Sequence, residues 1–155
     1  MAAMTSESKP VGYFNLLTPQ VNWVNEGSDS SGVFQYPGEG PTNQLISEQE
    51  TLTVNFSWSI SGVMHIISDV EAKLQVFLEC MGSAEASPGV YSTSVLMPMG
   101  GGTASFSSNV TIPVGLPVAL YRLSATLTCK AMPSGLYLPS AAFIDLGFIQ
   151  VYPNS

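Results

Sequence analysis

The chain has 155 residues, which is long enough for one domain to bury its own hydrophobic core. Eleven acidic residues against four basic ones give a formal net charge of −7, and the four, Lys9, Lys73, Arg122 and Lys130, are scattered along the sequence. Nucleic-acid binding and attraction to anionic lipid both need clustered basic residues. We therefore expect no nucleic-acid partner and no membrane partner.

Charged residues make up only 10% of the chain, against about 25% in an average soluble domain. Apolar residues account for 45%, and much of the remainder is Ser, Thr, Asn, Gln, Gly and Pro. One interpretation is a β-rich protein with a surface of hydroxyl groups. The other is a surface that is buried against further copies or a partner. Composition leaves both open.

Residues 1–10 are small and polar, and they contain no apolar stretch followed by a cleavage-like site. The uninterrupted apolar runs of the chain are far shorter than a membrane span. We expect residues 1–10 to form a polar N-terminal arm of a single domain, residues 1–155. We also expect the protein to be cytoplasmic.

Alternation of apolar and polar residues, interrupted by Gly- and Pro-rich joints, predicts about seven strands. In chain order they cover residues 12–23, 51–61, 73–80, 90–97, 104–112, 120–130 and 142–152. Residues 27–41 are acidic and rich in Gly and Ser, which predicts a mobile loop. Residues 66–72 have room for one short helical turn.

The second strand shows the alternation most clearly, with five apolar residues on one face and Ser, Thr or Asn on the other. The five are Leu52, Val54, Phe56, Trp58 and Ile60. In residues 73–80 the inward set is Leu74, Val76, Leu78 and Cys80, and Phe77 is the one apolar residue on the opposite face. In residues 120–130 the inward set is Tyr121, Leu123, Ala125, Leu127 and Cys129. These faces predict one core between two sheets.

Seven short strands at this spacing favour a Greek-key sandwich. The segment 120–127, in which Tyr121 opens an alternating apolar strand, resembles the sixth strand of immunoglobulin and fibronectin type III domains. The immunoglobulin Cys…Trp…Cys order is absent, because Trp58 precedes both Cys80 and Cys129. The predicted fold class is all-β: an immunoglobulin-like or fibronectin type III-like sandwich of no particular family.

No residue pattern predicts catalysis, a cofactor or a metal. His65 is the one histidine, and no Gly-x-Ser-x-Gly motif supplies a nucleophile for it. Zinc needs a clustered ligand set that one His and two distant Cys do not provide. The carboxylate pairs Glu48–Glu50 and Asp69–Glu71 lack the spacing of a calcium loop, so we expect solvated acidic loops there.

The two cysteines end two inward faces that we expect to be antiparallel neighbours. Cys80 and Cys129 would then lie about 20 Å or more apart. A disulfide needs Cα atoms within about 7 Å. We therefore predict two free, buried thiols.

The last strand carries the candidate interface, because it is apolar on both faces and a sandwich strand normally hides only one. The six candidate residues are Phe143, Ile149 and Val151 on one side and Ile144, Leu146 and Phe148 on the other. A bulge at Gly147 would exchange the two sides. Methionines in or next to loops, Met64, Met97, Met99 and Met132, are typical of adaptable contact surfaces.

The sequence thus predicts a non-enzymatic structural protein that binds itself or a protein partner, as a shell, filament or virion component does. The alternative is a carbohydrate-binding module that stacks sugars on exposed rings. The candidate rings for a glycan are Tyr13, Phe14, Trp23, Tyr36, Tyr91 and Tyr137.

Overall fold

The protein folds as a β-sandwich in a computed structural model. The structure describes residues 2–8, 14–26, 35–36, 44–47, 51–81, 89–100, 102–113 and 117–153. All regular elements in these ranges are strands except for α1 (Val63–Ile67). The predicted loop 27–41 lies outside the described residues, apart from one two-residue strand at 35–36. The predicted all-β class is therefore confirmed.

The smaller sheet has the order β1-β3-β6-β9, and a short strand, β4, also pairs with β3. All its pairs are antiparallel. Its strands are β1 (Ala2–Ala3), β3 (Asn15–Glu26), β4 (Gln35–Tyr36), β6 (Thr51–Ser61) and β9 (Ala104–Ile112).

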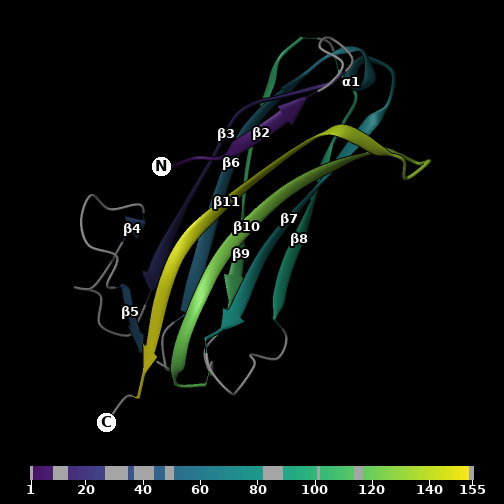
Figure 1. The fold of residues 1–155 in the computed structure, drawn as a ribbon. Coiled ribbons are helices and arrows are strands. Elements are labelled where there is room, and N and C mark those ends of the chain that lie inside the picture. The colour runs from purple at the N-terminus through teal and green to yellow at the C-terminus, as the bar shows by residue number, and fades with distance from the viewer. Residues whose placement is uncertain are drawn as a thin grey trace.

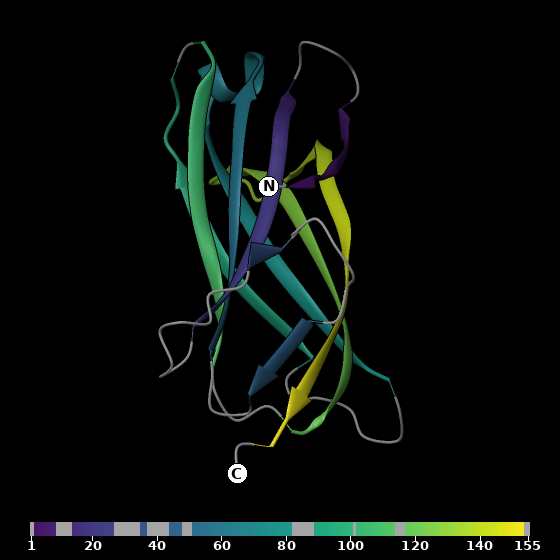
Figure 2. The same ribbon diagram turned by 90° about the vertical axis from the view of Figure 1, so that its left-hand side faces the viewer.

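The larger sheet has the order β2-β11-β10-β7-β8, and β5 pairs with β11 in parallel. Its strands are β2 (Thr5–Ser8), β5 (Gln44–Ser47), β7 (Asp69–Cys80), β8 (Val90–Met97), β10 (Ala119–Met132) and β11 (Tyr137–Tyr152). Three long strands thus face four across the core, and the long strands run the length of the molecule (Figure 1). Figure 2 shows the two layers from the side.

The N-terminal segment ties the two sheets together, whereas the sequence predicted an arm. Residues 2–3 pair with β3 of one sheet, and residues 5–8 pair with β11 of the other. Between them, Met4 is buried, and its amide donates a hydrogen bond to the Pro19 carbonyl at 2.9 Å. At the end of the β2–β11 ladder, where Ser140 lies opposite Ser8, the buried Ser140 hydroxyl donates a hydrogen bond to the Phe14 carbonyl at 2.8 Å.

The predicted inward faces form the core. In β6 every second residue is buried, and β7 and β10 show the same period. The β7–β10 ladder runs from Tyr121 opposite Cys80 to Met132 opposite Asp69 without a register shift. In β9 the even-numbered residues are half-buried to buried, and the odd-numbered residues are exposed.

The core also holds a polar contact across the sandwich. The Trp58 ring is 2% exposed, stacks on Phe106 with 6.2 Å between ring centroids, and donates from Nε1 to the Met97 sulfur at 3.2 Å. A buried indole N–H usually has such a partner. Because Trp58 lies on β6 and Met97 on β8, this contact links the two sheets.

A β-bulge in β11 exchanges the faces of that strand. Asp145 lies opposite Ser124 and Gly147 lies opposite Leu123, so Leu146 is the extra residue. The backbone of Gly147 has a φ of 89°, and its amide donates to the Asp145 carboxylate at 2.9 Å. Even-numbered residues face the core before the bulge and odd-numbered ones after it. The bulge predicted at Gly147 is therefore confirmed.

The start of β10 is fixed by a tyrosine. Tyr121 is fully buried, and its hydroxyl donates to the carbonyl of Pro117, four residues upstream, at 2.7 Å. Burial raises the pKa of the Tyr121 phenol, so the hydroxyl keeps the proton that it donates. This bond anchors the chain where it enters the sixth long strand.

Replacement of Trp58 by alanine should lower the free energy of unfolding by about 3–5 kcal/mol, because it removes a large buried ring and leaves a cavity. Urea denaturation measures the loss. The matched control is Leu136→Ala, at a side chain that is 69% exposed, and it should change stability by less than about 0.5 kcal/mol. A loss below about 1 kcal/mol for Trp58→Ala would contradict the described packing.

Replacement of Gly147 by alanine should cost about 1–2 kcal/mol, because a Cβ is strained at positive φ. Gly100→Ala is the control. A Cβ added at Gly100 would meet its nearest atom, Cε1 of His65, at an ordinary 3.8 Å. Equal losses of stability for the two variants would contradict the role of Gly147 in the bulge.

Candidate functional site

The outward face of the larger sheet carries the candidate site, and we call it the outer face. Along the central strand, β10, the side chains of Ser124 and Thr126 point outward between buried neighbours. Ser124 lies between Phe77 of β7 and Asp145 of β11, and Thr126 lies beside Phe143 of β11. The pairing register thus places a column of hydroxyl groups between aromatic rings on the flanking strands.

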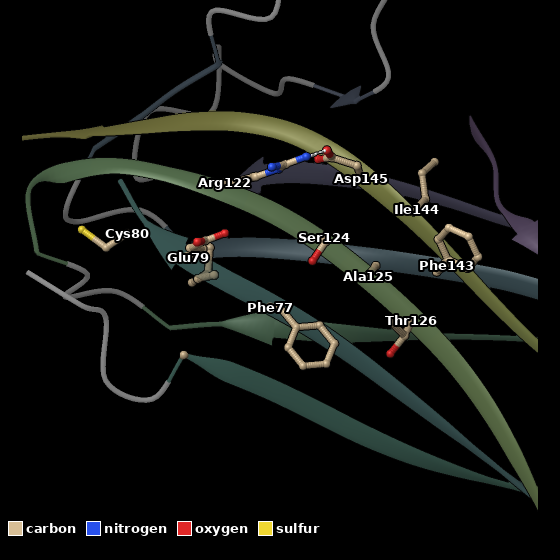
Figure 3. A pocket seen from close by; sticks show the side chains of 12 residues that line it. Phe77, Glu79, Cys80, Arg122, Ser124, Ala125, Thr126, Phe143, Ile144 and Asp145 are labelled. Carbon is tan, nitrogen blue, oxygen red and sulfur yellow. Dashed lines mark hydrogen bonds and ion pairs between the residues drawn. The ribbon is translucent and has the colours of Figure 1, made fainter. Parts of the chain in front are cut away.

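These residues line a surface groove of about 900 Å³ that crosses β7, β10 and β11. Figure 3 shows Phe77 on one side of the hydroxyl column and Phe143 on the other. Phe143 is 53% exposed, and Phe148, which lies opposite Arg122 on the same face, is 39% exposed. The groove therefore presents both ring surface and hydroxyl groups to solvent.

One end of the groove is polar. The Arg122 guanidinium forms an ion pair with Asp145, and Glu79 lies directly across the ladder from Arg122 (Figure 3). The hydrogen bond from Arg122, with that from the Gly147 amide, holds the pKa of the Asp145 carboxyl below its usual value. Both side chains of the pair are about half exposed, so the pair contributes little to the stability of the fold. Its main effect is to fix the orientation of the polar groups at this end of the groove.

The outer face is nearly balanced in charge in a protein of net charge −7. It carries three of the four basic residues, Lys73, Arg122 and Lys130, and four acidic residues of the described strands, Asp69, Glu71, Glu79 and Asp145. Lys130 pairs with Glu71 at 3.4 Å, and Arg122 pairs with Asp145. Most of the negative charge of the protein therefore belongs to other parts of the chain.

The six residues predicted as the interface do not share one surface. Leu146, Ile149 and Val151 are each 1% exposed and belong to the core, and Ile144 is half-buried against it. Phe143 and Phe148 lie on the outer face. The bulge explains the division, because it exchanges the two sides of β11 partway along the strand. The residues predicted on its second apolar face therefore lie partly in the core and partly on the outer face. The expectation that all six contact a partner is corrected to these two rings.

Of the rings predicted for sugar stacking, the three that the structure describes do not form a platform. Phe14 is buried in the core, Tyr91 is half-buried against it, and Tyr137 is exposed at the start of β11. The side chains of Tyr13, Trp23 and Tyr36 lie outside the described part of the chain. In the sequence, Phe77 is the residue that could have indicated the groove, because it is the single aromatic residue on the outward face of a strand that otherwise alternates regularly.

Of the four methionines predicted at contact surfaces, Met97 is fully buried and bonds Trp58. Met99 is 56% exposed, Met132 is half-buried, and the Met64 side chain lies outside the described residues. The exposed methionine surface is therefore smaller than the sequence indicated.

His65 is built into the end of the sandwich. Its ring is 2% exposed, Nε2 is 2.7 Å from the Pro98 carbonyl oxygen, and the backbone amide of Gly100 donates to the His65 carbonyl at 2.9 Å. The short Nε2 contact requires that this nitrogen carry the proton and donate it. The ring edge also packs on Phe106. His65 thus holds the 98–100 segment in place.

The carboxylate pair on β7 is also engaged. Asp69 accepts a hydrogen bond from the Met99 amide at 2.8 Å, and Glu71 pairs with Lys130. Glu48 and Glu50 lie outside the described residues. In the described part of the chain, no three His, Cys, Asp or Glu side chains gather as a metal site would require. None of its helices has the length and hydropathy to span a membrane.

The two cysteines are free, as predicted. Cys80 lies opposite Tyr121 and Cys129 lies opposite Ala72, so the ladder separates them by about 26 Å at about 3.3 Å per residue. Cys129 is 1% exposed, and burial raises the pKa of its thiol to about 12. Cys80 is half-buried at the edge of the groove, so the predicted burial holds fully for Cys129 alone.

Comparisons with known proteins give no family for this chain. No family model matches it, and no curated protein sequence matches it. A crystal structure of the "Putative ApaA Protein from Bordetella pertussis" is similar at 12% sequence identity and a TM-score of 0.31, covering 94% of this chain and 100% of that chain. Similarity at this level carries no argument about the fold or activity of the chain.

The two thiols should differ in reactivity in the native state. At pH 8 about one Cys129 thiol in ten thousand is ionised, and the thiolate is the reactive form. N-ethylmaleimide should therefore label Cys80 in the folded protein and Cys129 only after unfolding, as read by intact and peptide mass. Labelling of Cys129 first would contradict its described burial.

Proposed function

We propose that this chain is a non-enzymatic structural or interaction protein that associates with itself or a protein partner. The observation that supports this proposal is the outer face, a nearly neutral and partly apolar surface on an otherwise acidic protein. Two copies of a protein with charge −7 repel each other over most of their surface. Repulsion is much weaker at the outer face, and its exposed Phe143 and Phe148 rings lose contact with water when they are covered.

The chemistry of the groove agrees with recognition of a surface. At its polar end Arg122 and Asp145 are already paired within the sheet, so a partner need not neutralise these two charges. Its hydroxyl groups donate and accept hydrogen bonds in any orientation. The His65 ring, by contrast, is enclosed and bonded to a backbone carbonyl, which supports a structural role for it.

We further propose that the sandwich is immunoglobulin-like or fibronectin type III-like. Two observations support this. Of the seven long strands, the first, second and fifth (β3, β6 and β9) form one sheet. The third, sixth and seventh (β7, β10 and β11) lie in the other sheet, as in constant immunoglobulin domains. The bond from Tyr121 to the Pro117 carbonyl has the form of a tyrosine corner. The fourth long strand, β8, departs from the constant type because it pairs with β7.

We propose a cytoplasmic location for the protein, and the state of its cysteines supports it. Both thiols are free, and the β7–β10 ladder holds them too far apart to bridge within one chain. Unpaired thiols persist in reducing compartments.

A carbohydrate is the second candidate ligand, and the groove is the observation that favours it. Phe77 and Phe143 flank Ser124 and Thr126, with Arg122 at one end. Rings that stack on a sugar and polar groups that bond its hydroxyls are the usual elements of such a site. Here Phe77, which projects from the middle of the sheet, would be the platform.

Replacement of Phe143 by lysine should weaken association at least tenfold, because it places a charge on the neutral outer face. Sedimentation velocity over a concentration series measures the assembly, with 16.4 kDa as the monomer mass. Leu136→Lys is the matched control, because Leu136 is also exposed but lies at the turn between β10 and β11. Its association should equal that of the wild type.

Three results decide between the candidates. Wild-type protein that stays monomeric at high micromolar concentration and captures no partner would overturn the proposal of self-association and docking. A groove that binds soluble glycans in calorimetry, with binding lost in Phe77→Ala, would establish the alternative. Equal assembly of the Phe143 and Leu136 variants would remove the outer face from the interaction.

A further inference from the structure

The two sheets are protected at their edges on one side of the sandwich only. In the larger sheet the free edge of β11 is partly covered by β2 and β5, and in the smaller sheet that of β3 is partly covered by β1 and β4. At the other side, β8 and β9 end their sheets and contact each other. Within the described residues no strand pairs with the outer edge of β8 or β9.

The uncovered edge of β8 lacks the usual protection against pairing. Natural edge strands carry charged residues, proline or bulges that prevent another strand from adding. β8 has the sequence VYSTSVLM, without a charge or a proline, and it pairs with β7 over eight residues without a register shift. Val90 and Leu96 on its outward side are 41% and 56% exposed. Such an edge is a template for strand addition.

The ladder shows which backbone groups are available. The Leu78 amide donates to the Gly89 carbonyl at 2.9 Å, which makes this a hydrogen-bonded pair of the β7–β8 ladder. Antiparallel pairs alternate between bonded and non-bonded, so the odd-numbered residues of β8 bond to β7. The N–H and C=O groups of Val90, Ser92, Ser94 and Leu96 therefore point toward the open edge.

The side chains of β8 are arranged symmetrically about Thr93. Val90 and Leu96 are outward and apolar, and Ser92 and Ser94 are outward and carry hydroxyls. On the inward side, Tyr91 and Val95 flank Thr93. A two-fold axis at Thr93 would therefore match Val90 with Leu96, Ser92 with Ser94 and Tyr91 with Val95, and it would leave Met97 opposite Gly89.

We propose that β8 pairs antiparallel with β8 of a second copy of this chain, about a two-fold axis at Thr93. Val90 then faces Leu96 of the second copy, Ser92 faces Ser94, and Tyr91 faces Val95. Aromatic–β-branched and hydroxyl–hydroxyl pairs of this kind stabilise antiparallel sheets. All four available residues of each edge become hydrogen-bonded pairs, and the two outer faces join in one continuous sheet. The interface is isologous, as a two-fold dimer requires.

Neighbouring registers fit worse. A shift of the axis by one residue to Ser94 places Ser92 against Leu96 and Thr93 against Val95. A shift to Ser92 places Val90 against Ser94. Shifts of half a residue would put outward side chains opposite inward ones, which a continuous sheet does not allow. The inference rests on the proposed self-association. It adds to the outer face a second contact, at the edge of β8, and specifies the partner and the register of that contact.

The cross-linking test uses Thr93→Cys in a Cys80→Ser background. In the proposed dimer the two Thr93 residues form a non-bonded pair with Cα atoms about 4.5 Å apart, within the range of a disulfide. Mild oxidation should give a covalent dimer in high yield. Ser94→Cys is the matched control. Its two copies lie on a diagonal of about 7–8 Å, so its yield should be at least tenfold lower.

The blocking test uses Ser94→Pro, which removes an N–H that points to the open edge and leaves the bonds to β7 intact. Ser94→Lys, which adds a charge and keeps the N–H, covers the case in which the proline variant does not fold. Each should raise the dimer Kd at least tenfold in sedimentation. Ser107→Lys, at an exposed residue of the equally uncharged β9, should leave the Kd unchanged.

Hydrogen exchange gives a third readout. On association the amides of Ser92, Ser94 and Leu96 should gain protection, while those of Tyr91, Thr93 and Val95 are protected already in the monomer. Association that leaves the amides of Ser92, Ser94 and Leu96 unprotected would overturn the edge pairing and leave the proposed function standing. Association that both Ser94 variants retain would do the same. Preferred cross-linking at Ser94 would overturn the register. A monomeric wild type would overturn both.

Discussion

The bulge at Leu146 in β11 decides what this protein shows to its surroundings. A sandwich strand buries one face, and β11 has apolar residues on both. The extra residue exchanges the faces halfway along the strand, so that Leu146, Ile149 and Val151 join the core. Only Phe143 and Phe148 remain outside. The Gly147 amide bonded to Asp145 fixes this bulge, and Asp145 in turn pairs with Arg122 at the end of the groove.

The few charged residues of the chain are unevenly distributed over the structure, which their average content does not reveal. The outer face is nearly neutral because most of its basic and acidic side chains balance, and β8 and β9 are neutral because they carry no charge at all. Most of the net charge of −7 therefore belongs to other parts of the chain. Long-range repulsion keeps copies apart in most orientations and leaves a face and an edge where they can meet. Neutrality at these places supports association and restricts its geometry.

The two proposed surfaces are consistent with each other. Pairing of β8 with a second β8 extends the larger sheet across the two-fold axis, so that the outer faces of both copies lie side by side. The grooves around Phe77 and Phe143 then belong to one doubled surface. A partner that covers this surface would meet two sites at once, and the effective concentration of the second site would strengthen its binding.

Period-two alternation determined most of this fold from the sequence alone. In residues 51–61 and 120–130 a strand is the one regular structure that gathers the apolar residues on a single face, so these strands and their buried sides could be predicted. The free thiols followed from the same argument, because antiparallel pairing holds Cys80 and Cys129 at opposite ends of their strands.

Only the tertiary structure decided the placement of the candidate site. Whether Phe143 and Leu146 face water or the core depends on the position of the bulge, which sets the register of β11 against β10. This register is a non-local property, and the alternation within one strand does not contain it. The N-terminal segment is polar by composition, yet residues 2–8 pair with strands far along the chain. Likewise, the sequence predicted a strand at β8, but only the order of the sheet shows that no described strand pairs with its outer edge.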